Sequence, residues 1–369
     1  MKTSDLINTA IRQLPDMEVM EDYLKSEPAD VAKGFASGQL GMVPKAIVRP
    51  TASFESLAPS GITNGLESAR DEVRERAVDA GRRAISKIRK KGAAAKLDRE
   101  EARGLEAIIL LVGRPAILIQ DGKFFPPPKG WEILERLRPN IEQSFNSIGR
   151  IEVTGHPAGM DWIGTGFLVS DNVIMTNRHV AKEFCRMADA KKWEFEPGMT
   201  ARIDYNEQFG ATESAEFALT GIIGVHEKYD MALFKVALKS SSKAKPPKAL
   251  PIASSVPKVT KGRKVYVVGY PASDSRRNDP DEMRRIFSNI YDVKRLQPGE
   301  FRKIIPKDNE FEHDCSTLGG NSGSCVVDLD TNQVVGLHFS GSYLKANRAV
   351  ALWELVGDPL LKKAKVNFV

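Results

Sequence analysis

The sequence predicts two parts of different class: a mainly β domain over about residues 146–369, preceded by a mostly α-helical N-terminal region. Two observations carry this division. The C-terminal part has short apolar runs, rich in β-branched and aromatic residues and separated by Gly, Pro, Asn and Asp, which is the pattern of strands and turns. The N-terminal part has charged segments with narrow apolar stripes, which is the pattern of amphipathic helices. A chain of 369 residues has room for both.

Residues 1–95 form the first predicted region, a helical one of unknown role. Within it, residues 1–33 are predicted to be helical, residues 34–65 to be an irregular linker rich in Gly, Pro, Ser and Thr, and residues 66–91 to be a charged helix. The apolar stripe of that helix is thin, so it suits a helical hairpin or an oligomer contact.

The densest basic patch of the chain lies near the end of this helix. Its members are Arg82, Arg83, Lys87, Arg89, Lys90, Lys91 and Lys96. Such a patch could contact nucleic acid or an acidic partner. Acidic residues on the same segment (Glu67, Asp71, Glu72 and Glu75) instead indicate the solvated face of a helix. We therefore expect no nucleic-acid binding, and a partner protein remains the possible ligand of the N-terminal region.

Residues 96–145 are predicted to connect the two parts as helix, strand and helix. Asp98 and Glu101 have capping-box spacing, which predicts a helix to about Val112. An apolar run over residues 116–120 is followed by Asp-Gly, a hairpin turn signal. We expect this segment to pack on the domain that follows it.

Three motifs in fixed order carry the chemistry: Thr176–Val180 around His179, Tyr229–Leu233 around Asp230, and Gly319–Ser324 around Ser322. Serine is a weak nucleophile, so it needs a base within hydrogen-bond reach and a third group that orients the base. The glycines around Ser322 permit a tight turn that points amides at one spot. The amides of Gly320 and Ser322 are thus the predicted oxyanion hole, each donor contributing about 3–4 kcal/mol in the transition state.

Each motif also has a structural explanation. His179 alone could be a buried, hydrogen-bonded histidine, and Asp230 alone could be a turn or capping residue. A catalytically inactive relative is a further alternative. The order and local sequence of all three motifs favour the catalytic interpretation.

In the stretches GTGFLV, TNRHVA, YDMALF, STLGGNSGS and VVGLHFSG, over about residues 145–369, the chain resembles the trypsin-like (chymotrypsin-fold) serine peptidases, in particular the bacterial glutamyl-endopeptidase-like branch. The resemblance implies two six-stranded antiparallel β-barrels, at about 146–238 and 251–369, with the active site between them. His179 and Asp230 would come from the first barrel and Ser322 from the second. In that mechanism the histidine is base and then acid, and the aspartate orients it.

The resemblance also implies the walls of the pocket for the P1 side chain, the one just before the cut bond. Ser316 and Thr317 would line one wall; His338, Phe339, Ser340 and Gly341 would line the other. Ser316 stands where trypsin has an aspartate, so we expect no preference for Lys or Arg. Thr317 and His338 match residues that bind a P1 carboxylate in glutamyl endopeptidases, which favours an acidic or small polar P1 residue. The alternative is that His338 is a core-facing polar residue. Secreted glutamyl endopeptidases also use a freed α-amino group, whereas about 145 residues precede the barrels here.

Asn321 precedes the nucleophile where many trypsin relatives have an aspartate that pairs with a new N-terminus after zymogen cleavage. Asparagine cannot form that ion pair. The oxyanion turn must therefore be held in another way, and we expect any control to act through conformation or steric masking.

The composition predicts the compartment. Residues 1–14 lack an apolar leader core, and the most apolar stretch, residues 107–113, is too short to span a membrane. Three cysteines are few and odd in number, which favours a reduced, cytoplasmic protein with its thiols buried. We expect no cofactor and no metal, since His313-Asp314-Cys315 is a local cluster without a further ligand.

The sequence therefore predicts a cytoplasmic bacterial serine endopeptidase that makes limited cuts in protein substrates and has a regulatory N-terminal region. The alternative is a catalytically masked or inactive protease-fold protein that recruits partners through its helical N-terminus. The complete triad and oxyanion turn favour the enzyme.

Overall fold

The computed structural model describes residues 3–14, 17–18, 20–21, 78–109, 113–189, 192–258, 262–272, 290–317, 319–342 and 346–369. These residues fall into two compact units. The first holds the described residues up to Ala116 together with residues 126–135. The second holds residues 117–125 and the described residues from Arg136 onward. Each unit is described by itself.

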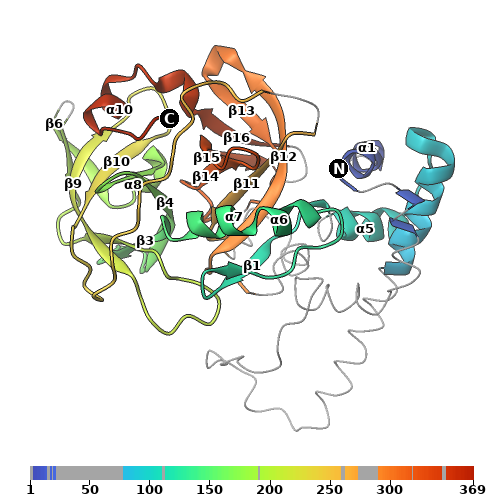
Figure 1. The fold of residues 1–369 in the computed structure, drawn as a ribbon, viewed down its shortest axis with the longest axis horizontal. Helices are drawn as coiled ribbons and strands as arrows, with labels where there is room; N and C mark the ends of the chain where they lie inside the picture. Colours follow the sequence, from blue (N-terminus) through green and yellow to red (C-terminus); the bar gives the residue numbers. More distant parts are fainter. Residues whose placement is uncertain are drawn as a thin grey trace, which may run out of the picture. The chain divides into compact units, whose positions relative to one another are not determined.

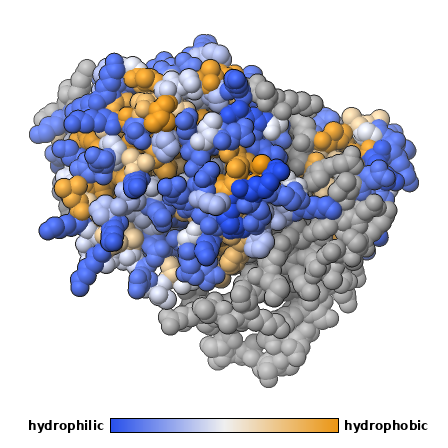
Figure 2. All heavy atoms as spheres, in the orientation of Figure 1, coloured by the Kyte–Doolittle hydropathy of each residue, from blue (hydrophilic) through white to orange (hydrophobic). Residues whose placement is uncertain are grey.

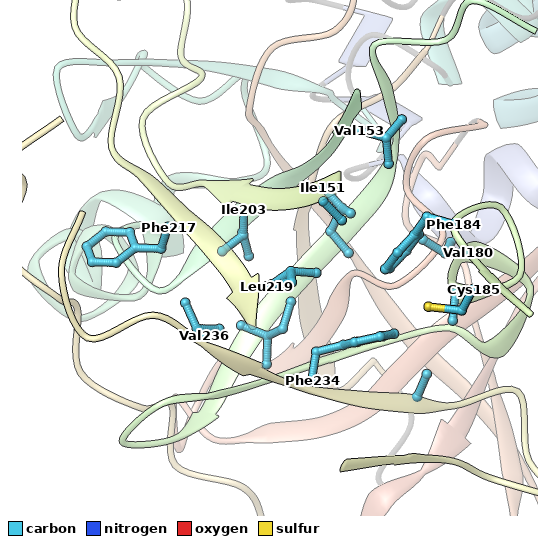
Figure 3. Packing of buried hydrophobic residues seen from close by; sticks show 14 of the residues in the cluster. Ile151, Val153, Val180, Phe184, Cys185, Ile203, Phe217, Leu219, Phe234 and Val236 are labelled. Carbon is cyan, nitrogen blue, oxygen red and sulfur yellow. The ribbon is translucent and has the colours of Figure 1, made fainter. Parts of the chain in front are cut away.

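Six strands close the first barrel of the second unit in the order β10-β5-β4-β3-β8-β9 (Figure 1). They are β3 (Ile148–Thr154), β4 (Trp162–Ser170), β5 (Val173–Thr176), β8 (Thr200–Asp204), β9 (Glu216–Val225) and β10 (Ala232–Val236). Alternating apolar residues of these strands fill the interior, where side chains such as Ile151, Ile203 and Phe234 gather (Figure 3). A hairpin of β6 (Cys185–Asp189) and β7 (Lys192–Phe195) stands beside it.

Six more strands close a second barrel, because β11 pairs with both β12 and β14. They are β11 (Lys264–Gly269), β12 (Arg295–Ile305), β13 (Glu310–His313), β14 (Cys325–Asp328), β15 (Val334–Ser342) and β16 (Ala346–Ala351). In its core Phe301 stacks on Phe311 with ring centroids 4.6 Å apart. The prediction of two six-stranded antiparallel barrels is confirmed.

The segment before the barrels adds to the second one. β1 (Ile117–Gln120) pairs with β12 through Ile117 opposite Leu296, and β2 (Lys123–Phe124) pairs with β1. Asp121 and Gly122 both have positive φ, 50° and 73°, which confirms the predicted hairpin turn.

Short helices complete the second unit and its connections. They are α6 (Glu132–Arg136), α7 (Arg138–Phe145), α8 (Arg178–Ala181) and α10 (Pro359–Lys363), with 3₁₀ turns η4 (Pro306–Asp308) and η5 (Leu352–Leu355). Arg138 fixes α7 to the hairpin: its guanidinium lies 3.7 Å from the ring centroid of Phe124 and donates to the Phe124 carbonyl at 2.7 Å.

The first unit has its own small helical core. It contains α1 (Thr3–Gln13), a helix over residues 78–91, the 3₁₀ turn η2 (Gly92–Ala94) and α5 (Arg99–Ile108). Residues that share this core include Leu6, Ile7, Ala10, Ala84, Ile85, Ile88, Leu105 and Ile108. Gly81 allows a close helix contact, since a Cβ there would lie 2.8 Å from the carbonyl oxygen of Gly104.

The capping box is confirmed: the Glu101 amide donates to Asp98 Oδ1 at 2.8 Å, and the Asp98 amide donates to Glu101 Oε2 at 3.0 Å. Lys87 of the basic patch also donates to Glu101 at 2.7 Å, so part of that patch is neutralised within its own unit. The predicted linker over residues 34–65, and the start of the charged helix before residue 78, lie outside the described residues.

The described surface seen in Figure 2 is mostly hydrophilic, with apolar side chains in small scattered groups. Among the helices that the structure describes, none is both long enough and apolar enough to cross a membrane.

Candidate active site

A histidine and an aspartate meet at one end of the first barrel. His179 lies on α8, which follows β5, and Asp230 lies just before β10. Because β5 and β10 pair antiparallel, with Thr176 opposite Ala232, the two residues lie next to each other. His179 Nδ1 is 2.6 Å from Asp230 Oδ2, and the His179 amide donates to Asp230 Oδ1 at 2.9 Å. The carboxylate thus fixes both the ring and the backbone of the histidine.

The electrostatics of this pair favour an ionised aspartate. Burial raises the pKa of Asp230, but the hydrogen bonds and charge of His179 outweigh it, so the pKa is lowered overall. The buried Asn177 side chain donates to the Asp230 carbonyl oxygen at 2.9 Å. Asn177 stands two residues before the histidine in the predicted motif, and sequence reasoning assigned it no role.

A second histidine, which sequence reasoning missed, shapes the loop that carries Asp230. His226 Nδ1 accepts from the amides of Lys228 and Tyr229, both at 3.0 Å. Its Nε2 lies 3.0 Å from Oδ2 of Asp358, the residue that caps α10. A nitrogen that accepts two amide hydrogens cannot carry its own proton, so the proton is on Nε2 and faces the carboxylate.

The turn with Ser322 comes from the second barrel and is tied to the first. The Thr165 amide donates to the Ser322 carbonyl at 2.9 Å, and Thr165 Oγ1 donates to the Gly320 carbonyl at 2.8 Å. A Cβ on Gly164 would lie 2.9 Å from Val180, next to His179, and 3.1 Å from the Ser322 carbonyl oxygen. Gly164 and Thr165 of β4 therefore lie between the helix that carries His179 and the turn that carries Ser322, and they contact both.

The glycines of the turn have the conformation that the motif predicts. Gly320 has φ of 84° and Gly323 has φ of 88°. A Cβ on Gly320 would lie 2.2 Å from the Tyr270 carbonyl oxygen, so no other residue fits without a shift. Among the described residues, none accepts a hydrogen bond from the amides of Gly320 or Ser322. Their role as oxyanion donors stays a prediction.

The residues predicted to line the P1 pocket come from two segments of the second barrel. Ser316 and Thr317 follow β13, while His338, Phe339, Ser340 and Gly341 lie on β15. A Cβ on Gly341 would be 3.4 Å from Thr317 Oγ1, so the two segments are in contact at this point. Thr317 Oγ1 is buried and has no hydrogen-bond partner within the described parts of the chain.

His338 is buried, and its Nδ1 lies 3.2 Å from Nε2 of the buried His313. Burial, and then the charge of His179, lower the pKa of His338 to about 3, so the ring is neutral. His313 therefore has a partner, His338, which the local sequence His313-Asp314-Cys315 did not indicate.

A pocket of about 280 Å³ opens beside Asp230 and Phe339. Its lining residues are Arg178, Lys228, Tyr229, Asp230, Asp308, Glu310, Phe339 and Val350. Asn309 Nδ2 donates to the Tyr229 hydroxyl at 2.6 Å, a bond that joins the two barrels at this edge of the site.

Within the described residues, Glu152, Asp204 and Glu207 form the carboxylate cluster with metal-ligand spacing. Arg150 contacts Glu152 at 2.5 Å and Glu207 at 3.1 Å, and Arg202 contacts Glu152 at 2.6 Å. Guanidinium groups thus already compensate the charges of Glu152 and Glu207.

Comparisons with known proteins agree with this geometry. Residues 164–337 match the family model of the trypsin-like peptidase domain. A probable serine protease of Lysobacter enzymogenes is 25% identical over 289 residues, which are 69% of this chain and 74% of that protein. A glutamyl endopeptidase of Staphylococcus epidermidis is 25% identical over 194 residues, and the match spans 52% of this chain and 59% of that one.

Two solved structures resemble the chain at lower identity. The active form of the Rv3671c protease of M. tuberculosis has a TM-score of 0.40 at 19% identity, covering 62% of this chain and 85% of that one. A serine endoprotease of Yersinia pestis has a TM-score of 0.42 at 15% identity, covering 65% and 69%. The match to the family model, together with the two barrels, shows that the chain contains a trypsin-like peptidase domain.

Proposed function

We propose that the chain cuts peptide bonds in proteins through an acyl-enzyme formed on Ser322. The observation that supports this most strongly is the His179–Asp230 pair, held beside the Ser322 turn by Gly164 and Thr165. His179 Nε2 takes the Ser322 hydroxyl proton while Oγ attacks the substrate carbonyl. The resulting oxyanion accepts from the amides of Gly320 and Ser322.

The intermediate then collapses. The C–N bond breaks, and the imidazolium of His179 gives its proton to the leaving amine. A water molecule, deprotonated by the same ring, attacks the acyl group and releases the acid, which restores the serine hydroxyl. Asp230 stays ionised and stabilises the imidazolium, consistent with its lowered pKa.

The test is covalent labelling of the intact chain with a fluorophosphonate probe, with the labelled residue mapped by mass spectrometry. We expect labelling at Ser322 and none in Ser322→Ala. A folded chain that is not labelled at Ser322 would contradict an assembled triad.

The same site supports an acidic P1 preference. Thr317 offers a buried hydroxyl without a partner among the described residues. If His313 Nε2–H donates to His338 Nδ1, then His338 carries its proton on Nε2, a second donor for a carboxylate. A bound carboxylate would also raise the pKa of His338. A peptide library should be cut mainly after Glu or Asp, and Thr317→Val should reduce that preference. Cutting mainly after Lys, Arg or Phe would contradict the assignment.

A regulatory role for the N-terminal unit and a cytoplasmic location complete the proposal. The unit has its own core, and all three thiols of the chain are buried. Gly81→Val would push the helix over residues 78–91 away from α5, since even a Cβ would be 2.3 Å from Ile108 Cδ1. If the N-terminal unit is regulatory, the rate of Ser322 labelling should change in this full-length variant. An unchanged rate, in a variant whose helical unit is disrupted, would argue against a regulatory role.

A further inference from the structure

A hydrogen bond between two uncharged, buried side chains holds the oxyanion turn. Asn321 is fully buried, and its Oδ1 accepts a hydrogen bond at 3.1 Å from Nε2 of Gln297, which is also fully buried. Ser322, the nucleophile, comes directly after Asn321, and Gly320, an oxyanion donor, comes directly before it. The position of one side chain thus sets the position of both oxyanion amides.

The surroundings leave Asn321 little freedom. A Cβ on Gly269 of β11 would lie 2.4 Å from Asn321 Oδ1 and 2.2 Å from Ser324 Oγ, so β11 packs directly against the turn. The Asn321 carbonyl accepts from the Ser324 amide at 3.0 Å. The turn can therefore shift only if the side chain of Asn321 leaves its place.

Gln297 is itself held firmly. It lies on β12, where it is opposite Val267 of β11. On the other side of β12, the two preceding residues, Arg295 and Leu296, pair with Leu118 and Ile117 of β1. Gln297, which donates the hydrogen bond to Asn321, thus directly follows two residues that are paired with strands on both sides.

We propose that Gln297 is a positioning residue that holds the oxyanion turn in its active shape through Asn321. The inference rests on the proposed function of this site. A buried carboxylate needs a charged partner, whereas the neutral amide of Asn321 can be held by the neutral donor of Gln297. The turn is therefore formed in the uncut chain, with no need for a newly freed amine. Its donors are in place before substrate arrives, as oxyanion stabilisation requires.

The first test replaces Gln297 by leucine, which keeps the size and removes the donor. The matched control is Tyr266→Phe, because the Tyr266 hydroxyl is also buried in the second barrel but donates to Asn332, at 2.6 Å, rather than to the turn. We expect Gln297→Leu to lower kcat at least about tenfold with KM within about twofold, and to slow fluorophosphonate labelling in parallel. Tyr266→Phe should lower the melting temperature and leave kcat within about twofold.

The second test uses pH. In Asn321→Asp, both forms of the carboxyl can accept from Gln297, but burial disfavours the charged form, which the neutral Gln297 does not neutralise. The activity of this variant relative to the wild type should therefore fall as pH rises between about 5 and 8. Adding Gln297→Lys supplies the cation and should restore activity at the upper end of that range.

The outcomes separate the two proposals. An unlabelled wild type would contradict the proposed function. If the wild type is labelled but Gln297→Leu loses no more kcat than Tyr266→Phe, the role proposed for Gln297 is wrong. A flat pH ratio for Asn321→Asp, or no recovery with Gln297→Lys, would overturn it as well.

Discussion

Lys294 places a titratable amine in the interior of the second unit, and this should make stability depend on pH. The side chain is fully buried, and Nζ donates to the carbonyls of Phe145 at 2.6 Å and Tyr205 at 2.7 Å. Burial lowers the pKa of Lys294 to about 7 from its usual 10.5, although nearby Asp204 and Glu207 oppose the shift. The folded chain therefore holds this amine neutral above pH 7.

The sign follows from proton binding. Between about pH 7 and 10.5 the unfolded chain keeps a proton on this amine that the folded chain has lost, so the free energy of unfolding rises with pH. The two pKa values differ by about 3.5, which corresponds to about 5 kcal/mol over the whole window at 1.36 kcal/mol per pH unit. Between pH 7 and 9 the rise is about 2 kcal/mol.

Lys294→Met isolates this effect. The variant leaves the Phe145 and Tyr205 carbonyls without their donor, a cost that is the same at every pH. Urea unfolding at pH 7, 8 and 9 should show the wild type gaining about 2 kcal/mol relative to the variant across this range. Acids with raised pKa, such as Cys185 at about 12, titrate in both proteins and cancel in the difference. Parallel curves, or a relative gain by the variant, would refute the reasoning.

Three further substitutions test the site. Asp230→Asn should lower kcat by about 10⁴-fold, because the wrong histidine tautomer is then favoured, while the melting temperature stays near that of the wild type; an unchanged kcat would remove Asp230 from the triad. Gly269→Ala should slow Ser322 labelling, since its methyl group would meet Asn321 and Ser324, and normal labelling in a folded protein would show that the turn can move aside. His226→Phe should cost about 2 kcal/mol of stability by unfolding in urea and should also lower kcat, because two amides of the aspartate loop lose their acceptor. Its control, Asp358→Asn, keeps an acceptor for His226 and should retain most of the activity.

Much of the architecture could be predicted because its signals are local. The strands follow from short apolar runs between turns, whereas their arrangement in two barrels was implied by the resemblance to the trypsin-like serine peptidases. The β1–β2 turn and the capping box follow from residues two or three positions apart. The His179–Asp230 pair was also predicted, since each residue lies in a recognisable motif, although their motifs are far apart in the chain.

The partners that escaped prediction are distant in sequence and have no motif. Gln297 lies 24 residues before Asn321, and His226 lies 132 residues before Asp358. His313 and His338 are 25 residues apart and meet only because β13 and β15 both pair with β16. Which residues meet across a barrel depends on strand register, and register is set by the packing of the whole sheet.

The pairing of β1 with β12 also determines how the chain can be divided. A fragment that begins at Asn146 would contain every residue assigned to the active site, yet it would lack β1. The edge of β12 at Arg295 and Leu296, both fully buried in the intact chain, would then present unpaired backbone and an apolar side chain to solvent. Exposed strand edges of this kind recruit strands from other molecules. The β1–β2 hairpin therefore covers an edge that would otherwise favour aggregation. Loss of solubility in such a fragment would say nothing about catalysis.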